Sequence, residues 1–256
     1  MSNILEARGL CKDYGLFSLK GVSFELPKGF IMGFVGPNGA GKTTTIKSIL
    51  GIIKAESGSV KVFGQEGSVS CNEDIGVVME APMYVEDWTM RDMEKAIAPF
   101  YAKWDSGCFA KHIRRFGLDP KKKVKELSRG MKVKLQVAAA LSHDAKLLIL
   151  DEPTSGLDPV ARDEICDLLR EFVTDEDRGV LFSTHICSDL DKTADYITFI
   201  LDGKIVFTGT KDDLTQKYAR VAGGMDDLSA EQKKCVIGIS FYSSIYVRWH
   251  LYRFFP

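Results

Sequence analysis

Apolar residues in the first third of the chain come in short runs separated by glycine-rich turns, a pattern typical of β-strands. Strands are expected over residues 4–8, 22–26, 31–35, 59–62 and 75–79. From about residue 85 to residue 141 the apolar positions instead recur at helical spacing. Helices are expected there over residues 90–101, 107–116 and 129–141. The pattern predicts a sheet-rich N-terminal part followed by an inserted helical subdomain.

Strands and helices alternate in the C-terminal half of the chain. Residues 147–150 form an uninterrupted apolar run, as expected of a central parallel strand that is covered on both faces. A helix, a strand, a helix, the two strands of a hairpin and a closing helix are expected next, over residues 160–173, 179–183, 186–193, 196–201, 204–208 and 211–218. This order predicts an α/β fold in which a central, mainly parallel sheet is flanked by helices, with an N-terminal antiparallel β subdomain.

The segment after the third expected strand matches the P-loop pattern G-x-x-x-x-G-K-[ST], with Gly36, Pro37, Asn38, Gly39, Ala40, Gly41, Lys42 and Thr43. In this pattern the glycines let successive backbone N–H groups surround a β-phosphate. Lys42 is expected to reach the β and γ oxygens, and the hydroxyl of Thr43 to ligate Mg²⁺. Because the helix expected from Lys42 adds its positive end, the segment predicts a nucleoside-triphosphate site in a P-loop NTPase.

Two carboxylates follow the apolar run 147–150, which puts Asp151 and Glu152 at the carboxyl edge of the sheet beside the phosphate loop. Asp151 is expected to hold Mg²⁺, and Glu152 to activate the attacking water as general base. His185 ends the next expected strand, where its imidazole can donate a hydrogen bond to a γ-phosphate oxygen. No role is assigned to the other histidines, His112, His143 and His250.

Composition excludes several classes of protein. The chain has 256 residues and a formal net charge of −1, so no global field draws it to nucleic acid or to an anionic membrane. Its six cysteines form no C-x-x-C pair, which argues against zinc and disulfides and favours a reducing compartment. No apolar run approaches the roughly 18 to 20 residues that cross a bilayer, and no signal-peptide pattern opens the sequence. A cytoplasmic protein is expected.

Residues 127–132, Leu-Ser-Arg-Gly-Met-Lys, open the helix that precedes the acidic strand, and Ser128 is a good N-cap there. With the phosphate loop and the acidic strand on either side, the chain resembles the ATP-binding cassette (ABC) ATPases, the nucleotide-binding subunits of ABC transporters, whose signature reads L-S-G-G-Q. The resemblance covers about residues 3–215. It includes residues 155–158, similar to the family's D-loop, and Tyr14, where the family stacks an aromatic ring on adenine.

In this family two cassettes meet head to tail. The resemblance therefore implies that Ser128 and Gly130 of one chain complete the γ-phosphate site held by Lys42 of another, so that a monomer is catalytically incomplete. It implies ATP and Mg²⁺ as cofactors, with catalytic roles for Lys42, Glu152 and His185. The residues expected to contact the nucleotide are Tyr14, Gly36, Pro37, Asn38, Gly39, Ala40, Gly41, Lys42, Thr43, Thr44, Glu80, Ser128, Gly130 and Asp158. Those expected to hold the metal are Thr43, Glu80 and Asp151.

Two segments depart from the family's pattern. Glu80 stands where the Q-loop usually has Gln, so that a carboxylate replaces an amide near the Mg²⁺ and the attacking water. In the signature, Arg129 and Met131 stand where Gly and Gln are commonest, while Ser128 and Gly130 are kept. These variants resemble exporter-type cassettes that pair with a separately encoded membrane subunit.

The expected domains are an ABC ATPase domain over residues 1–218, with its helical subdomain at about 85–141, and an extension over residues 219–256. The expected function is ATP hydrolysis coupled to transport, in the direction of export. The expected partners are a second ABC subunit, identical or related, and a polytopic membrane permease that holds the chain at the cytoplasmic face of the membrane. No nucleic-acid partner is expected.

Two other functions are compatible with a P-loop. A soluble cassette that acts on nucleic acid or ribosomes has local support only from the lysines of residues 121–125, and it usually carries two cassettes or a long coiled-coil insert. A P-loop kinase of small molecules gives no reason for residues 127–130 or 155–158.

The last residues, 241–256, are rich in aromatic side chains, with Arg248 and Arg253 as their only formal charges. Three interpretations stay open: a segment lying on a membrane, a strand packed on the cassette, or sequence altered by a frameshift or truncation. The third is favoured because the patterned globular character ends after Ile239.

Overall fold

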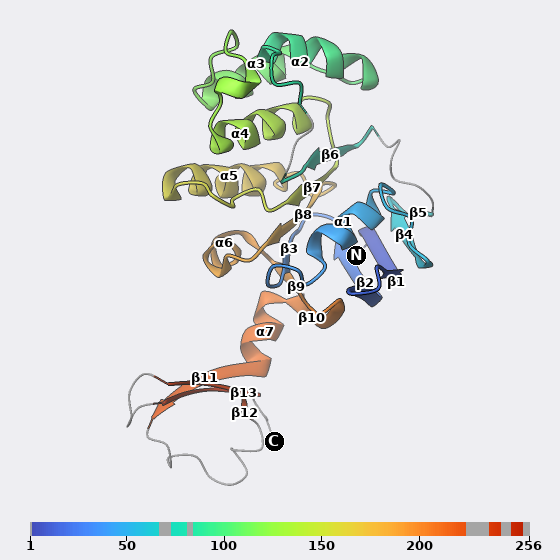
Figure 1. Cartoon of the computed structure of the whole chain (residues 1–256), viewed down its shortest axis with the longest axis vertical. Coiled ribbons are helices and arrows are strands. Elements are labelled where there is room, and N and C mark those ends of the chain that lie inside the picture. Colours follow the sequence, from blue (N-terminus) through green and yellow to red (C-terminus); the bar gives the residue numbers. More distant parts are fainter. Residues whose placement is uncertain (1, 67–72, 81–83, 224–235, 242–246, 253–256) are drawn as a thin grey trace. The chain divides into compact units, whose positions relative to one another are not determined.

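The computed structural model describes residues 2–66, 73–80, 84–223, 236–241 and 247–252, with side chains up to residue 216. Its contacts divide the chain into two units, Met1–Thr208 and Gly209–Pro256. The first unit contains two sheets and a layer of helices (Figure 1). The predicted domain boundary at residue 218 stays a prediction.

A six-stranded sheet forms the centre of the first unit, in the strand order β10-β9-β3-β8-β7-β6. The strands are β3 (Ile31–Val35), β6 (Ile75–Val78), β7 (Leu147–Asp151), β8 (Gly179–Thr184), β9 (Tyr196–Leu201) and β10 (Lys204–Thr210). Neighbours from β9 to β6 pair in parallel, which confirms the predicted mainly parallel sheet. Every residue of β3, β7 and β8 is buried, because layers of structure cover both faces of these strands.

The predicted hairpin closes one edge of this sheet. Strands β9 and β10 are joined by the two-residue turn Asp202–Gly203, in which both residues have positive φ angles of 47° and 74°. Turns of this kind match the right-handed twist of the two strands that they connect.

An antiparallel sheet, with the order β2-β1-β4-β5, forms the N-terminal β subdomain. Its strands are β1 (Asn3–Asp13), β2 (Ser18–Pro27), β4 (Ser57–Val62) and β5 (Gln65–Glu66). The first two are longer than predicted, since pairing continues past the apolar residues as far as Asp13 opposite Ser18. Apolar patterning marks only the part of a strand that faces a core, so the exposed ends of these strands left no such mark.

One hydrophobic core joins the two sheets. Helix α1 (Lys42–Ile49) contacts β7 of the parallel sheet and both β1 and β2 of the antiparallel sheet. Ile46 and Ile49 are buried from this helix, and the rings of Phe24 and Phe34 lie 5.3 Å apart across the core. The helix that follows the phosphate loop is therefore anchored by the packing of both sheets.

Three helices lie against the opposite face of the parallel sheet: α4 (Arg129–Ala140), α5 (Pro159–Phe172) and α6 (Cys187–Thr193). Two glycines allow this close packing. A Cβ atom on Gly33 of β3 would lie 2.1 Å from Leu190 of α6, and one on Gly76 of β6 would lie 2.8 Å from the Ala140 carbonyl oxygen of α4. These helices thus rest directly on strand backbone.

The inserted helical subdomain is confirmed, and it lies at one end of the first unit (Figure 1). It contains α2 (Met90–Ile97), η2 (Ala98–Phe100), α3 (Ser106–Arg115), η3 (Val124–Glu126) and α4. The helix expected over 90–101 ends early as an α-helix and continues as the 3₁₀ turn η2, because Pro99 lacks an N–H and disfavours helical geometry at the residue before it. Thr89 and Asp105 cap α2 and α3 through their side chains.

The second unit begins within β10 and continues with α7 (Lys211–Lys217), β11 (Tyr218–Gly223), β12 (Val236–Phe241) and β13 (Val247–Tyr252). Its three strands form an antiparallel sheet in the order β11-β13-β12. The aromatic tail, residues 241–256, thus contributes the last residue of β12 and the whole of β13, while its remaining residues lie outside the described part. Within the described residues, no helix combines the length and apolar character that a membrane span requires.

Candidate active site

The carboxyl ends of three neighbouring strands bring the predicted chemistry together. Strand β3 pairs in parallel with β8, so that Val35 before the phosphate loop lies beside Thr184 before His185. Strand β8 also pairs with β7, which sets Asp151 beside Ser183. Loops that follow adjacent parallel strands share one edge of the sheet, and the site forms at that edge.

The phosphate loop has the backbone that its glycines predict. Gly41, the residue before α1, has a φ angle of 111°, which L side chains rarely adopt. A Cβ atom at Gly41 would also lie 2.8 Å from the ring of Phe17. Helix α1 begins at Lys42 as predicted, so the N–H groups of its first turn face the loop.

The ammonium group of Lys42 is buried beside the loop, with 5% of its side chain exposed. Its Nζ donates to the carbonyl oxygens of Gly36 at 2.7 Å and Pro37 at 3.2 Å. It also lies 3.1 Å from Oε1 of Glu152. A buried cation is costly without partners; here the two carbonyl oxygens accept hydrogen bonds from the ammonium group, and the carboxylate of Glu152 compensates its charge.

The carboxylate of Glu152 lies between the side chains of His185 and Lys42. Its Oε2 lies 2.8 Å from Nδ1 of His185, and because an ionised carboxylate only accepts, the imidazole N–H donates. Its Oε1 faces Lys42. The backbone of Glu152 has a positive φ of 51°, a conformation that is uncommon for residues other than glycine.

The neighbouring carboxylate, Asp151, is held by Ser183. The hydroxyl of Ser183 donates to Oδ1 of Asp151 at 2.7 Å and accepts from the backbone N–H of Glu152 at 2.9 Å. The other oxygen of Asp151, Oδ2, is buried without a hydrogen-bond partner among the described residues. A buried carboxylate oxygen without a donor is unfavourable, and a hard cation such as Mg²⁺ would satisfy it.

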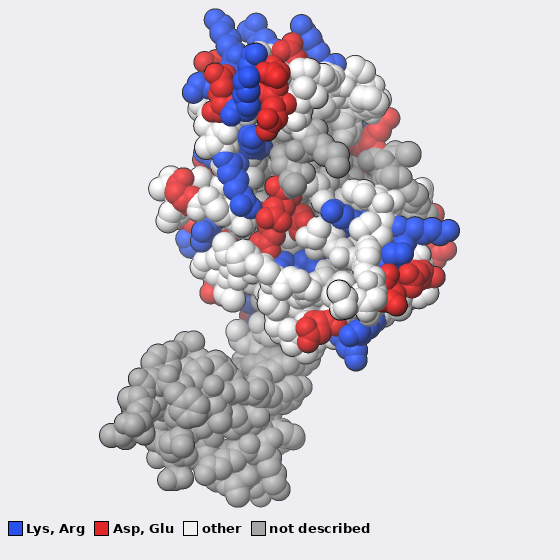
Figure 2. All heavy atoms as spheres, in the orientation of Figure 1, with Lys and Arg blue, Asp and Glu red and all other residues white. Residues whose placement is uncertain are grey.

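Lys42, Glu152 and His185 line one cleft of about 490 Å³. Its lining comprises Phe17, Asn38, Gly39, Gly41, Lys42, Thr43, Thr44, Glu80, Glu152, Ser155 and His185. Figure 2 shows acidic side chains gathered in a hollow at the middle of the displayed face of this unit. Phe17 and Ser155 were not expected in the lining. Phe17 lies three positions after Tyr14, and this second aromatic residue in the same turn was the signal that could have indicated it.

Several predicted residues lie outside this lining. Tyr14 is half exposed in the turn between β1 and β2, with Nζ of Lys12 5.7 Å from its ring centre.

Ser128 caps α4 by accepting from the Met131 N–H at 3.3 Å, and Gly130 lies in the first turn of that helix. Asp158 caps α5; the hydrogen bond from the Ala161 N–H lowers the pKa of its carboxyl group. Of the other phosphate-loop residues, Gly36 and Ala40 are buried and Pro37 is exposed, and Asp151 is buried at the end of β7.

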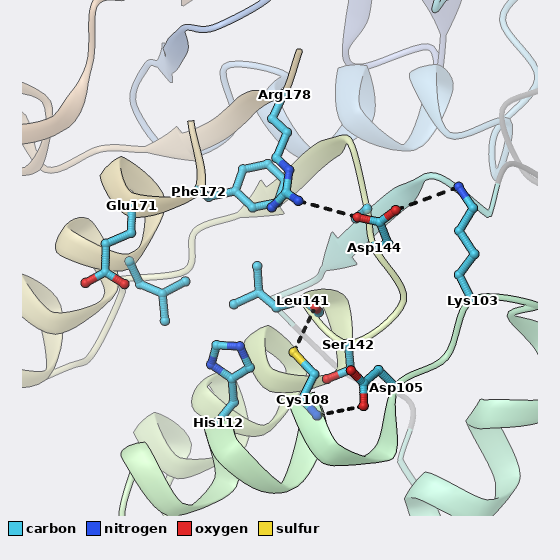
Figure 3. A pocket seen from close by; sticks show the side chains of 12 residues that line it. Lys103, Asp105, Cys108, His112, Leu141, Ser142, Asp144, Glu171, Phe172 and Arg178 are labelled. Carbon is cyan, nitrogen blue, oxygen red and sulfur yellow. Dashed lines mark hydrogen bonds and ion pairs between the residues drawn. The ribbon is translucent and has the colours of Figure 1, made fainter. Parts of the chain in front are cut away.

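A second hollow, of about 410 Å³, lies between α3 and the C-terminal ends of α4 and α5. Asp144 there lies between Arg178, at 3.4 Å, and Lys103, at 3.9 Å (Figure 3). The thiol of Cys108 donates to the Leu141 carbonyl oxygen, and burial raises its pKa. None of the predicted site residues lines this hollow, and its charges compensate one another, so its chemistry does not suit a triphosphate.

The parallel sheet, the loop before α1 and the buried lysine define a P-loop nucleotide-binding protein. The model of the family described as "ABC transporter" matches residues 19–155, more than half of the chain. The chain belongs to this family, and it is an ATP-binding and ATP-hydrolysing subunit of an ABC transporter.

Curated relatives and solved structures agree with this assignment. The lantibiotic transport ATP-binding protein SrtF of Streptococcus pyogenes is 35% identical over 206 residues, which cover 79% of this chain and 89% of the relative. The bacitracin transport ATP-binding protein BcrA of Bacillus licheniformis is 35% identical over 93% of this chain and 78% of its own length. A solved ATP-binding subunit of an ABC transporter has a TM-score of 0.73 at 27% identity, covering 82% of this chain and 91% of its own. CbiO1 of Clostridium perfringens, part of the transporter complex CbiONQ, gives 0.70 at 25% identity, with 84% and 91% covered.

The predicted family, fold and ATPase activity are therefore confirmed. The relatives described above are transporter subunits, and they give no support to the alternative of a cassette that acts on nucleic acid or ribosomes.

Proposed function

We propose that this chain closes head to tail with a second ABC subunit around two MgATP and thereby drives export through a separate membrane subunit. The observation that carries the proposal is the buried carboxylate of Glu152, held between Lys42 and His185 at the phosphate loop. Such an arrangement suits hydrolysis of a γ-phosphate, because a general base, a cation that stabilises negative charge and a loop that binds phosphate share one cleft.

Each residue of the cleft has a definite task in this proposal. Lys42 would exchange its backbone carbonyl partners for β and γ oxygens, because an ammonium group prefers anionic acceptors. Glu152 would accept a proton from the attacking water, and His185, whose N–H donates to that carboxylate in this structure, would donate instead to the γ-phosphate once the nucleotide is bound. Thr44, Asn38 and the loop N–H groups would position the phosphates.

Mg²⁺ would be held by Asp151, Thr43 and Glu80 together with phosphate oxygens. The buried Oδ2 of Asp151 suits a cation, and the hydroxyl of Thr43 and the carboxylate of Glu80 line the cleft. Among the described residues, no cluster of three or more His, Cys, Asp or Glu side chains forms a metal site by itself. This agrees with Mg²⁺, which is usually bound through one or two carboxylates and the phosphates of a nucleotide.

A second subunit would supply what the cleft lacks. Ser128, Gly130 and Asp158 belong to motifs that match the family, yet they lie outside the cleft that contains Lys42 of the same chain. In a head-to-tail pair, the first turn of α4 would instead face the γ-phosphate of the partner. The adenine would stack on an aromatic ring of the turn between β1 and β2, that of Tyr14 or Phe17.

Export is proposed because the relatives named for lantibiotic and bacitracin transport align over most of this chain. The chain would work at the cytoplasmic face of the membrane, bound to a polytopic permease that determines the substrate. Antimicrobial compounds are the substrate class that the relatives' names suggest.

The proposal is tested with Glu152→Gln, which keeps the shape of the base but removes its proton acceptor. Turnover should fall at least about a hundredfold while ATP binding is kept, so that ATP accumulates in a stable dimer. Sedimentation of the variant with and without MgATP measures this dimer.

A second substitution tests the contribution of the partner subunit. Adding Ser128→Ala to Glu152→Gln should abolish the ATP-dependent dimer. The matched control is Asp105→Ala, which removes the side-chain cap of α3 in the same helical layer and should leave the dimer intact. An ATP-dependent dimer that persists without Ser128, or turnover that persists without the Glu152 carboxylate, contradicts the proposal.

A further inference from the structure

One carboxylate in the lining of the cleft has a cationic partner of its own. Glu80 follows β6 and lines the same hollow as Lys42 and Thr43. Nη2 of Arg129, the first residue of α4, donates to Oε1 of Glu80 at 3.1 Å. About half of each side chain is exposed, with values of 52% for Arg129 and 51% for Glu80.

The guanidinium group reaches a second loop of the cleft as well. Its Nη2 also lies 3.4 Å from the hydroxyl of Ser155, another residue of the lining. A Cβ atom at Gly156 would lie 3.3 Å from Cδ of Arg129, so the absent side chain there makes room for the arginine against the loop. Arg129 therefore bridges the ends of β6 and the loop after β7.

Helix α4 is held at the end of β6 by a second side chain. The amide of Gln136 accepts from the Met79 N–H at 3.0 Å and donates to the Met79 carbonyl oxygen at 3.1 Å. Gln136 and Arg129 are seven residues apart, so both project from one face of the helix. Gln136 thus holds the backbone of Met79, the residue before Glu80, whereas Arg129 contacts the side chain of Glu80.

We propose that Arg129 is a positioning residue for nucleotide binding, which neutralises Glu80 and holds its carboxylate at the β6 side of the cleft. A triphosphate carries several negative charges, and an uncompensated carboxylate in the same cleft opposes its binding. The ion pair removes this repulsion within one chain. The inference rests on the proposed nucleotide site, because ATP has to bind over Lys42.

The test measures equilibrium binding of ATP without metal to dilute full-length protein, so that neither turnover, Mg²⁺ nor a second subunit contributes. Arg129→Gln should weaken ATP binding about fivefold, since Glu80 is left without its cation. Arg129→Lys should stay within about twofold of the wild type. Glu80→Gln should bind metal-free ATP more tightly than the wild type, because it removes the repulsion at its source.

The double variant Glu80→Gln/Arg129→Gln decides between compensation of charge and a structural contact. Under the proposal its affinity returns to within about twofold of the wild type, and raising KCl from about 0.05 M to about 0.5 M narrows the deficit of Arg129→Gln. A double variant that binds as weakly as Arg129→Gln, or an Arg129→Gln that binds normally, overturns the proposal. The matched control is Arg115→Gln, which breaks the Arg115–Glu171 pair of α3 and α5 outside the cleft and should leave ATP binding unchanged.

Failure of the site and failure of the inference can be told apart. Lys42→Ala that binds ATP normally would refute the nucleotide site itself. If Lys42→Ala loses ATP binding as expected, but the ATP affinity of the Glu80 and Arg129 variants does not follow the charge at Glu80, only the role of Arg129 is refuted.

Discussion

Ser183 connects the two acidic residues of the site through one hydroxyl group. It donates to Asp151 and accepts from the Glu152 backbone, and it is completely buried. Its importance follows from geometry alone, since a serine within an apolar strand carries no motif. The parallel register between β7 and β8 brings it opposite Asp151.

Ser183→Ala is expected to destabilise the protein and to weaken metal-dependent ATPase activity. The substitution removes the donor to a carboxylate that is 1% exposed, which leaves a buried charge without its hydrogen bond. The free energy of unfolding, measured by urea denaturation, should fall by about 1–3 kcal/mol. The control Ser48→Ala, which removes a hydroxyl that donates to the Thr44 carbonyl oxygen and not to a charged group among the described residues, should cost less. Equal costs would contradict this account of Ser183.

Two residues that depart from the family's pattern, Glu80 and Arg129, form a contact that the sequence does not show. Glu80 and Arg129 are 49 positions apart, and each differs from the family's pattern within its own motif. In the structure they are partners. No local pattern predicts this pair, because it depends on how α4 is laid against the end of β6.

In the inserted helical subdomain, apolar spacing predicted the bounds of two helices well and those of a third less well. Helices α3 and α4 begin and end within one residue of the expected positions, since apolar spacing and the caps Asp105 and Ser128 agree. Helix α2 was expected to be longer, and Pro99 ended it.

The inserted helical subdomain is expected to lose stability in mild acid. Burial lowers the pKa of both His112 and His143; Arg115 and Lys111 add to the effect at His112, while a hydrogen bond to the Glu73 carbonyl opposes it at His143. The unfolded chain, with histidine pKa values near about 6.5, therefore binds these protons first. The contribution to stability is complete above that pH and is lost as pH falls through the lower pKa values of the folded state.

Urea denaturation at about pH 7.5 and about pH 5.5 measures this effect. The wild type should lose more free energy of unfolding between the two conditions than the variant His112→Gln/His143→Gln, whose side chains do not titrate in this range. Parallel losses would show that other groups cause the acid sensitivity. His143 also stacks on Tyr101 at 4.0 Å, so the variant is compared with itself across pH and not with the wild type at one pH.

For the whole molecule, the core and the proposed site lie in the unit Met1–Thr208. Shortening the chain to end at Lys217, after α7, should therefore keep a cooperative unfolding transition and ATP affinity within about twofold. Circular dichroism during heating and equilibrium ATP binding measure these two properties. An aggregated or unfolded product would contradict the assignment of folding information to the first unit.

The sequence by itself determined the kinds of elements, their order, the phosphate loop and the family, because these depend on spacing between near neighbours in the chain. It also indicated that Asp151, Glu152 and His185 gather at one edge, since parallel strands place their carboxyl ends together. Only the tertiary structure decided which side chains meet: Ser183 with Asp151, Arg129 with Glu80, and Phe17 in the cleft beside Gly41. Such contacts join residues that are distant in sequence, and strand register and helix packing, which local patterns do not encode, select among them.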